Sequence, residues 1–309
     1  MLHNALPLAR HLLDRDGASR ADTTLVPRLR ASASTRVMAV QSGTVLRAQQ
    51  IDGSAPALAW LNPHEIPDAE IWLYLGPGRL AAVLSTEQAT ALQPEALRWA
   101  GIRTLAPVLS DEDNAFAIEA VAVANWHESH GFCPRCGSAT EVIKSGWVRR
   151  CPAENSEVFP RTDAAVIVRI TDADDRLLLG SNVAWETNRY SLLAGFVDPG
   201  ESLEGAVVRE VFEESGLRIV EPRYLGSQPW PFPASLMLGF EATLAADQAP
   251  HETVPDGEEI VDLRWFSRDD VRAAGDSVLL PGSISIAGAM IREWLDAEPP
   301  RVADDGAHE

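Results

Sequence analysis

The sequence predicts an α+β protein in which two larger domains flank a small metal-binding ribbon. The chain has 309 residues, enough for more than one hydrophobic core, and 46% of them are hydrophobic, as in ordinary globular proteins. All three cysteines fall within residues 133–151. Segments of β type follow this cluster and surround one strongly acidic helix that begins after Pro199 and Gly200.

The composition limits the function class and the compartment. A formal net charge of −19 argues against a protein that coats nucleic acid, because such proteins carry a basic surface. His11, Asp14 and Arg15 interrupt the N-terminal apolar residues, so no signal peptide is expected. No run of about 18 apolar residues occurs, so we expect no membrane span. An odd number of cysteines favours a metal site or free thiols, and therefore a reducing cytoplasm.

Residues 1–128 are predicted to form a mixed α/β domain. Segments rich in aliphatic residues and Trp predict strands at 35–41, 58–62, 70–76 and 79–85. A partly helical segment follows, with Ser85 as its N-cap and an interruption at Pro94. A second helix is predicted over 111–129, with an acidic first turn and an apolar side made of Phe116, Ile118, Ala122 and Trp126. No catalytic group of residues is found here, so dimerisation or shaping of a substrate site is the expected role.

Residues 129–160 are predicted to form a zinc ribbon. Cys133 and Cys136 make one C-x2-C knuckle, and Cys151 begins a second knuckle that ends in Glu154 instead of a cysteine. A carboxylate oxygen can bind zinc, so three cysteines and Glu154 are the predicted ligands of one structural ion. His130 or His127 is an alternative fourth ligand, and a ribbon without metal, held by its packing, is the remaining alternative.

Lys144, Arg149 and Arg150 form one local basic cluster, for which a solvated ribbon face is the favoured interpretation.

Residues 161–298 are predicted to form a β-rich sandwich with helices, and 299–309 a disordered tail. Expected strands lie at 164–170, 176–181, 191–196, 218–228, 235–245 and 262–266. A short helix is expected after Ser267, and a last helix over 285–297.

The stretch from Gly195 to Leu217 carries the strongest chemical signal. At about 100° per residue, Arg209, Glu210, Glu213 and Glu214 fall on one arc of a helix that faces outward. Val207, Val208, Val211 and Phe212 fall on the other arc and are expected to pack on the sheet. Like charges at this spacing repel, so a divalent cation over the carboxylates is favoured over a solvated acidic face. Arg209 is expected to pair with Glu201 or Glu213, and Gly195 and Gly200 allow close approach of the loop backbone.

These residues resemble the Nudix box, G-x5-E-x7-R-E-U-x-E-E-x-G-U, where U is aliphatic. Its defined positions are filled by Gly195, Glu201, Arg209, Glu210, Val211, Glu213, Glu214, Gly216 and Leu217. The resemblance implies an α/β/α sandwich with a mixed sheet, and hydrolysis of a nucleoside diphosphate derivative with two or three Mg²⁺ or Mn²⁺ ions. It implies Glu210 and Glu214 as metal ligands and Glu213 as ligand or base. A further ligand is expected at Glu259, with Glu258 as the alternative ligand or base, and the Ala194 carbonyl is expected to join them.

A second motif narrows the substrate. In SQPWPFPAS, residues 227–235, three prolines stiffen the segment and present Trp230 and Phe232, which suit stacking on a base. A hydrophobic loop that covers the domain edge is the alternative. The segment resembles the signature of the NADH pyrophosphatase branch, which also has an N-terminal domain and a zinc ribbon. Two departures are Glu154 and the Val158-Phe159 pair, where the branch has cysteine and commonly tyrosines. The implied substrate contacts are Phe159, Phe196, Gln228, Pro229, Trp230, Pro231, Phe232, Pro233, Ala234, Ser235 and Ala287.

The resemblance therefore implies cleavage of NADH or NAD to nicotinamide mononucleotide and AMP, and removal of NAD caps from RNA 5′ ends, by a homodimer. A Nudix hydrolase of ADP-ribose or diadenosine polyphosphates is the alternative enzyme. A non-catalytic nucleotide sensor and a zinc-ribbon nucleic-acid binder are the alternatives from other classes, but the complete box speaks against the first and the acidic charge against the second.

Overall fold

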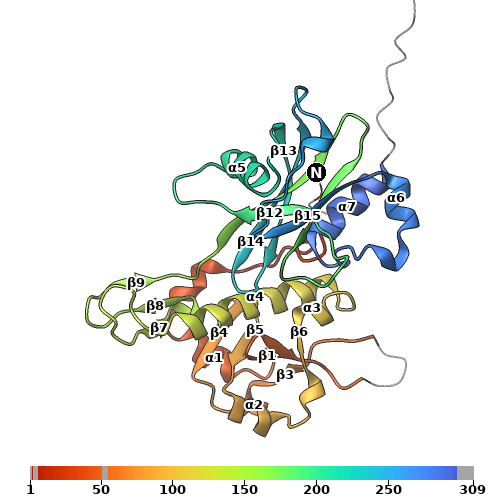
Figure 1. The fold of residues 1–309 in the computed structure, drawn as a ribbon. Coiled ribbons are helices and arrows are strands. Elements are labelled where there is room, and N and C mark those ends of the chain that lie inside the picture. The colour runs from red at the N-terminus through yellow and green to blue at the C-terminus, as the bar shows by residue number, and fades with distance from the viewer. Residues whose placement is uncertain (1, 3–5, 51–54, 298–309) are drawn as a thin grey trace, which may run out of the picture. The chain divides into compact units, whose positions relative to one another are not determined.

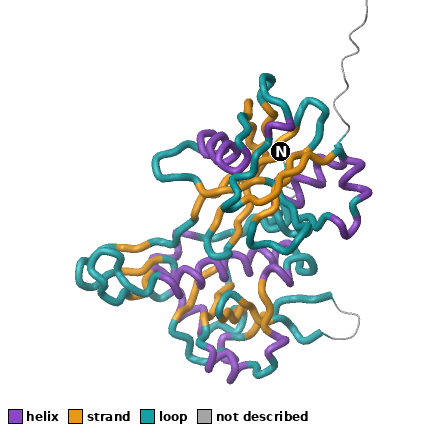
Figure 2. The backbone as a smooth tube through the Cα atoms, in the orientation of Figure 1, coloured by secondary structure: helices purple, strands orange, loops and turns teal. Residues whose placement is uncertain are grey.

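The computed structural model describes residues 2, 6–50 and 55–297, and the predicted disordered tail lies outside them. Contacts within the chain form two compact units. One contains residues 7–163 together with 228–236, and the other contains the described residues of 1–6, 164–227 and 237–309. Helices and strands occur in both units, which confirms the predicted α+β class (Figures 1 and 2).

The N-terminal unit is built on a mixed sheet of six strands. Their order is β4 (Ile71–Gly76), β5 (Arg79–Val83), β1 (Arg36–Gln41), β2 (Thr44–Leu46) and β6 (Trp99–Gly101), and β3 (Trp60–Leu61) also pairs with β1. Strands β1 and β5 are parallel, whereas β4 and β5 are antiparallel. The shorter helices are α1 (Leu25–Arg30), α2 (Thr86–Leu92) and α3 (Ile102–Leu105). The four predicted strands are confirmed, whereas the short strands β2 and β6 were not predicted.

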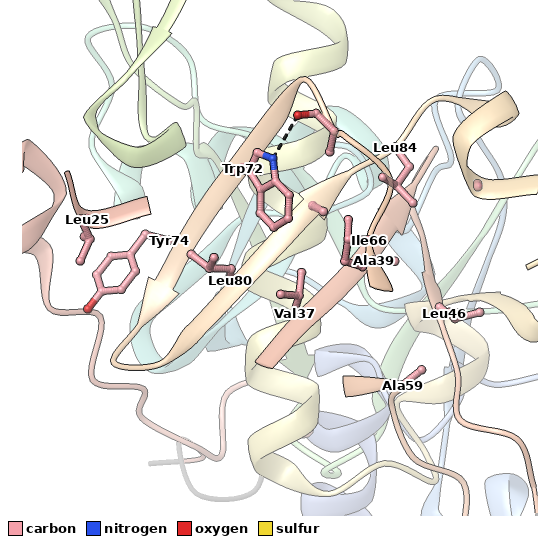
Figure 3. Packing of buried hydrophobic residues seen from close by; sticks show 13 residues of the cluster. Leu25, Val37, Ala39, Leu46, Ala59, Ile66, Trp72, Tyr74, Leu80 and Leu84 are labelled. Atoms are coloured by element: carbon pink, nitrogen blue, oxygen red, sulfur yellow. Dashed lines mark hydrogen bonds between the residues drawn. The ribbon is translucent and has the colours of Figure 1, made fainter. Parts of the chain in front are cut away.

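A hydrophobic core covers one side of this sheet (Figure 3). Trp72 of β4 packs among aliphatic side chains from β1 and β5, and its indole N–H donates to the Ala69 carbonyl over 3.0 Å. Ser85 accepts a hydrogen bond from the Gln88 amide over 3.2 Å, so it caps α2 as predicted. Because Pro94 lacks an amide hydrogen, the helix ends before it, and 3₁₀ helix η3 (Ala96–Arg98) follows.

Helix α4 (Asp111–Ser129) has the predicted bounds and joins the sheet to the ribbon. Phe116, Ile118 and Trp126 are buried as expected, whereas Ala122 is only partly buried. The ribbon consists of β7 (Glu141–Ile143), β8 (Val148–Arg150) and β9 (Glu157–Val158), in that order, with 3₁₀ helix η4 (Lys144–Gly146). It docks on β4, because the Trp147 indole donates to the Tyr74 carbonyl over 2.8 Å. No helix among the described residues is long and apolar enough to cross a membrane.

The predicted basic cluster of the ribbon is not a free cationic surface. Lys144 pairs with Glu157 over 2.8 Å, and Arg150 pairs with Glu141 over 2.7 Å. Arg149 is buried, and its guanidinium donates to the hydroxyl of Thr140 over 2.6 Å. The favoured interpretation, a solvated ribbon face, therefore holds for Lys144 and Arg150, which are exposed, and was wrong for Arg149, which is buried.

The C-terminal unit is a sheet flanked by helices. Its strand order is β13 (Ile219–Trp230), β14 (Ser235–Leu244), β10 (Asp163–Thr171), β11 (Leu177–Asn182) and β15 (Ile260–Phe266), with β12 (Leu193–Phe196) paired to β10. The helices are α5 (Leu203–Ser215), α6 (Arg268–Ala273) and α7 (Ile286–Asp296). Figure 1 shows α5 on one side of this sheet and α7 on the other, as in the predicted sandwich. The remaining 3₁₀ helices are η1 (Gly17–Ala21), η2 (Pro63–Glu65), η5 (Pro250–Glu252) and η6 (Gly275–Ser277).

The predicted apolar arc of α5 was partly wrong. Val207 and Val211 are fully buried, but Val208 is 42% exposed and Phe212 is 55% exposed. At about 100° per residue, positions 207, 211 and 214 share one narrow face, and this face meets the sheet. Glu214 therefore points inward with the valines, and Val208 and Phe212 turn toward solvent.

Candidate active site and zinc site

Helix α5 begins and ends at residues suited to those positions. The Ser202 hydroxyl accepts a hydrogen bond from the Gly205 amide over 3.0 Å and caps the N-terminus. Gly200, with φ +93°, makes the turn that leads into it, and Gly216, with φ +69°, ends it in the left-handed conformation. The thirteen residues of α5 hold three carboxylates of the box, Glu210, Glu213 and Glu214, on one rigid element.

Gly195 of β12 lies directly under the carboxylate of Glu210. A Cβ atom at position 195 would be 2.0 Å from the Glu210 Cδ atom and 2.1 Å from its Oε1 atom. No side chain fits there while Glu210 keeps its place. The first glycine of the box therefore makes room for a carboxylate, rather than only letting the loop backbone approach.

Arg209 ties the loop and the helix together. Its guanidinium binds Glu201 in a bidentate manner, with Nε to Oε1 at 3.0 Å and Nη2 to Oε2 at 2.8 Å. It also donates to Glu213 Oε2 over 2.9 Å and to the Phe196 carbonyl over 2.9 Å, and lies 3.0 Å from Glu210. Arg209 thus pairs with both of its predicted partners. These hydrogen bonds lower the pKa of Glu201 and raise that of Arg209.

Glu214 is a buried carboxylate that lacks a complete set of partners. It is only 5% exposed, and its Oε2 atom has no hydrogen-bond partner among the described residues. Burial first, and then repulsion by Glu210, Glu259 and Asp256, raises its pKa to about 8. Burial also raises the pKa of Glu210. Such a set of carboxylates fits a divalent cation, because a bound positive charge would offset both the desolvation of the carboxylates and their mutual repulsion.

The acidic turn before β15 supplies the other predicted ligand. One carboxylate oxygen of Asp256 accepts the backbone amides of Glu258, Glu259 and Ile260 over 2.9, 3.0 and 2.9 Å, and these bonds hold the turn. Glu258 and Glu259 are both exposed. Among the described residues, the box glutamates and Glu259 do not form a group whose ligand atoms all lie within 4.8 Å of one another. Glu210 and Glu259 are nevertheless near enough to Glu214 for their charges to raise its pKa.

The ribbon cysteines do form such a group. The sulfur atoms of Cys133, Cys136 and Cys151 lie within 4.8 Å of one another, and those of Cys136 and Cys151 are 3.5 Å apart. The Glu154 Oε2 atom is 4.0 Å from the Cys133 sulfur and 3.7 Å from Arg135 Nε. Hydrogen bonds from Ser138 and the neighbouring thiols lower the pKa of Cys136 to about 7. Three clustered thiols fit one zinc ion. Glu154 approaches the Cys133 sulfur but does not lie within 4.8 Å of all three sulfur atoms.

The two histidines considered as alternative zinc ligands have other contacts. Both ring nitrogens of His127 are engaged: Nε2 lies 2.7 Å from the Gly146 carbonyl, and Nδ1 lies 2.9 Å from Arg149. His130 ends α4, and its Nδ1 atom lies 2.9 Å from the Ser129 hydroxyl and 3.2 Å from the Trp126 carbonyl. These contacts favour Glu154 over His127 in particular.

The aromatic-proline segment is the tip of the β13–β14 hairpin, with Trp230 as the last residue of β13 and Ser235 as the first of β14. The rings of Trp230 and Phe232 meet edge to face with centroids 5.1 Å apart. Gln228 and Pro231 are buried, whereas Pro229 and Ala234 are partly accessible and Pro233 is exposed. Residues 228–236 pack with the N-terminal unit.

The remaining predicted substrate contacts lie in different surroundings. Phe159 and Phe196 are each 58% exposed, the former after β9 and the latter at the end of β12. Ala287 is buried in α7, and Ala194 lies in β12 opposite Ile167, close enough for its backbone to hydrogen-bond Glu214.

Sequence reasoning did not identify three residues that organise these sites. Asp256 holds the acidic turn, and the Asp-Gly pair at 256–257 was a usable turn signal. Arg103 and Asn125 contact the hairpin tip from the N-terminal unit. No local pattern marks these two, because each contact joins positions more than 100 residues apart along the chain.

Comparisons with known proteins agree with this arrangement. Residues 160–284 match the family model of the NUDIX domain, and residues 128–159 match that of the NADH pyrophosphatase zinc ribbon domain. The chain is 38% identical to the NAD-capped RNA hydrolase NudC of Mycobacterium bovis BCG Pasteur, over 93% of this chain and 95% of that protein. It is 36% identical to NudC of Pseudomonas syringae, over 88% and 93%. It is 34% identical to the human NAD-capped RNA hydrolase NUDT12, over 62% of this chain and 44% of that protein.

Proposed function

The chain belongs to the Nudix hydrolases with an NADH pyrophosphatase zinc ribbon, the family of NudC, and we propose that it cleaves the pyrophosphate of NADH and NAD and removes NAD caps from RNA 5′ ends. The observation that carries the proposal is the Glu210–Glu214 site. There, a glycine makes room for one carboxylate and a second carboxylate is buried with an unpartnered oxygen. Water adds across the pyrophosphate, and the products are AMP and nicotinamide mononucleotide, reduced when the substrate is NADH.

Each box residue has a distinct task in this proposal. Glu210 and Glu214 hold the divalent cations, with the Ala194 carbonyl and Glu259 as further ligands. Arg209 keeps Glu201 and Glu213 in place through its hydrogen bonds. Glu213, at the exposed edge of the helix, or Glu258 takes the proton of the attacking water. When bound, Mg²⁺ or Mn²⁺ neutralises pyrophosphate oxygens and lowers the pKa of a water, and we propose two or three ions per site.

The aromatic residues supply recognition of the bases. We propose that Trp230 and Phe232 at the hairpin tip, together with Phe159 and Phe196, stack on the planar groups of the dinucleotide. Gln228, Ala287 and the prolines of the tip are further substrate contacts in this proposal. The excess of acidic residues favours recognition of the cap and a few nucleotides over long contacts with RNA.

The ribbon and the assembly complete the proposal. Cys133, Cys136, Cys151 and Glu154 hold one structural zinc ion, because four protein ligands leave no open position for catalysis. We propose an N-terminal domain over 1–128, a ribbon over 129–160 and a Nudix domain over 161–298. A homodimer in the cytoplasm is the assembly that we propose.

The test replaces Glu214 with an uncharged side chain of the same shape. Purified wild type and Glu214→Gln are incubated with NADH, NAD, NAD-capped RNA and ADP-ribose under Mg²⁺ or Mn²⁺, and the products are identified by mass spectrometry. Glu204→Gln is the matched control, since Glu204 is exposed on the same helix. We expect the wild type and the control to yield AMP and nicotinamide mononucleotide, and Glu214→Gln to lose at least about 10³-fold in rate.

Two results would contradict the proposal. Full NADH cleavage by a folded Glu214→Gln variant would exclude Glu214 as a ligand. Faster wild-type turnover of ADP-ribose than of NADH would favour the alternative Nudix substrate.

A further inference from the structure

Side chains from the helices of the N-terminal unit contact the hairpin tip at residues 228–236. The Arg103 guanidinium carbon of α3 lies 4.5 Å from the ring centroid of Phe232 and 5.4 Å from that of Trp230. A guanidinium at these distances is attracted by the face of an aromatic ring. Arg103 thus covers one face of Phe232, and a planar base would reach only the opposite face.

Two hydrogen bonds hold the same tip, one at its backbone and one where it joins β13. The Asn125 side-chain amide of α4 donates to the Pro231 carbonyl over 3.0 Å. The Leu8 amide donates to the buried Gln228 side-chain oxygen over 3.4 Å. Between the tip and α4 lies a cavity of about 170 Å³, lined by Asn125 and His130 on one side and Pro233 on the other.

The tip needs contacts with side chains outside it, because its own backbone has few amide hydrogens to form hydrogen bonds. Pro229, Pro231 and Pro233 have no amide hydrogen, so half of the six residues from 228 to 233 cannot donate a backbone hydrogen bond. Pro231 can use only its carbonyl, and that carbonyl is the group bound by Asn125. The conformation of Trp230 and Phe232 therefore depends on Arg103 and Asn125.

We propose that Arg103 and Asn125 are positioning residues, through which the N-terminal unit sets the affinity of the hairpin tip for the base of a nicotinamide dinucleotide. The inference rests on the proposed function and gives the N-terminal unit a part in it. The unit orders the aromatic rings before substrate arrives, so binding does not have to order them. Arg103 and Asn125 take no part in the chemical step, which the residues of the Nudix box carry out.

The experiment combines amide hydrogen exchange with steady-state kinetics on the full chain. Arg103→Ala, Arg103→Lys and Asn125→Ala are compared with wild type. Thr104→Ala, at the exposed neighbour of Arg103, and Arg28→Ala, at an exposed arginine of α1, are the controls. Exchange is followed by mass spectrometry in peptides that cover residues 227–240, and KM and kcat are measured with NADH.

We expect both alanine variants to speed exchange in the tip by about fivefold and to raise KM by a similar factor, with kcat within about twofold of wild type. A fivefold change corresponds to about 1 kcal/mol, since about 1.4 kcal/mol is tenfold. Arg103→Lys should recover most of the wild-type KM, because an ammonium group keeps the charge over the ring. Both controls should match wild type in exchange and in KM.

Three outcomes would overturn the inference. Unchanged exchange in Arg103→Ala and Asn125→Ala would show that these side chains do not hold the tip. Faster exchange with an unchanged KM would show that holding the tip does not affect substrate affinity, and a drop in kcat alone would place the residues in the chemical step. If wild type does not cleave NADH, the proposed function and the substrate role of the tip fail together, whereas the exchange data still decide whether the two residues hold it.

Discussion

Replacing Gly195 with alanine tests the geometry of the active site most directly. The added methyl carbon would lie 2.0 Å from the Glu210 Cδ atom, whereas non-bonded carbon atoms rest about 3.5–4.0 Å apart. One of the two groups must therefore move by about 1.5 Å or more. Gly195 lies in β12 opposite Val166 and does not have a positive φ, so the backbone accepts alanine and the Glu210 carboxylate is the group that moves.

The expected effect is a loss of turnover with a folded protein. A displacement of about 1 Å at a reacting centre costs about 10²-fold in rate, so we expect kcat for NADH to fall by at least that factor. The free energy of unfolding should change by no more than about 2 kcal/mol, because alanine restricts the unfolded chain while the crowding is relieved by one side chain. The apparent affinity for Mn²⁺ should weaken, since Glu210 is the proposed ligand that is displaced.

The assay is the initial rate of NADH hydrolysis across a Mn²⁺ titration, together with thermal denaturation. Gly17→Ala is the matched control, because no atom lies within 4 Å of a Cβ built there. A Gly195→Ala variant with wild-type kcat, Mn²⁺ requirement and Tm would refute the proposal that Glu210, held against β12, is a metal ligand.

Two further predictions concern the N-terminal unit. Burial raises the pKa of Glu119 to about 7 despite ion pairs with Arg15 and Arg20, so the folded protein retains a proton between about pH 4.5 and 7 that the unfolded chain releases. Its contribution to stability should fall by about 3 kcal/mol as the pH rises through this window, and Glu119→Gln should flatten the dependence of Tm on pH; an unchanged slope would contradict this. Glu154→Cys should tighten zinc binding by at least about tenfold in competition with a chromophoric chelator, and Glu154→Ala should weaken it. Equal zinc affinity in Glu154→Ala and wild type would rule out Glu154 as a ligand.

Features that depend on neighbouring residues were predictable from the sequence. The bounds of α4 followed from its acidic first turn and from the His130-Gly131 end, and Ser85 and Ser267 cap their helices as expected. The membership of the Nudix family followed from the box, because spacing along one helix is a local property. The three-cysteine cluster followed from the spacing of its knuckles.

Features that depend on distant contacts were not predictable. Helical spacing places Val207 and Val211 on one narrow face and Val208 and Phe212 beside it, but only the contact with the sheet decided which of these four apolar residues are buried. The local basic cluster of the ribbon proved to be paired within the ribbon, and one of its members is buried. The contacts of Arg103 and Asn125 with the hairpin tip have no counterpart in any sequence pattern.

The sequence by itself determined which candidate ligands and which turns the protein has: the carboxylates of α5, the thiols of the ribbon, and the glycines and capping residues that bound the elements. Tertiary structure alone decided which of these groups lose water and which find a partner. Glu214 is buried with an unpartnered oxygen, Glu210 occupies the space that Gly195 leaves, and Arg209 joins Glu201 to Glu213. Burial and pairing set the charge state and the position of a group, and both arise from packing between segments that lie far apart along the chain.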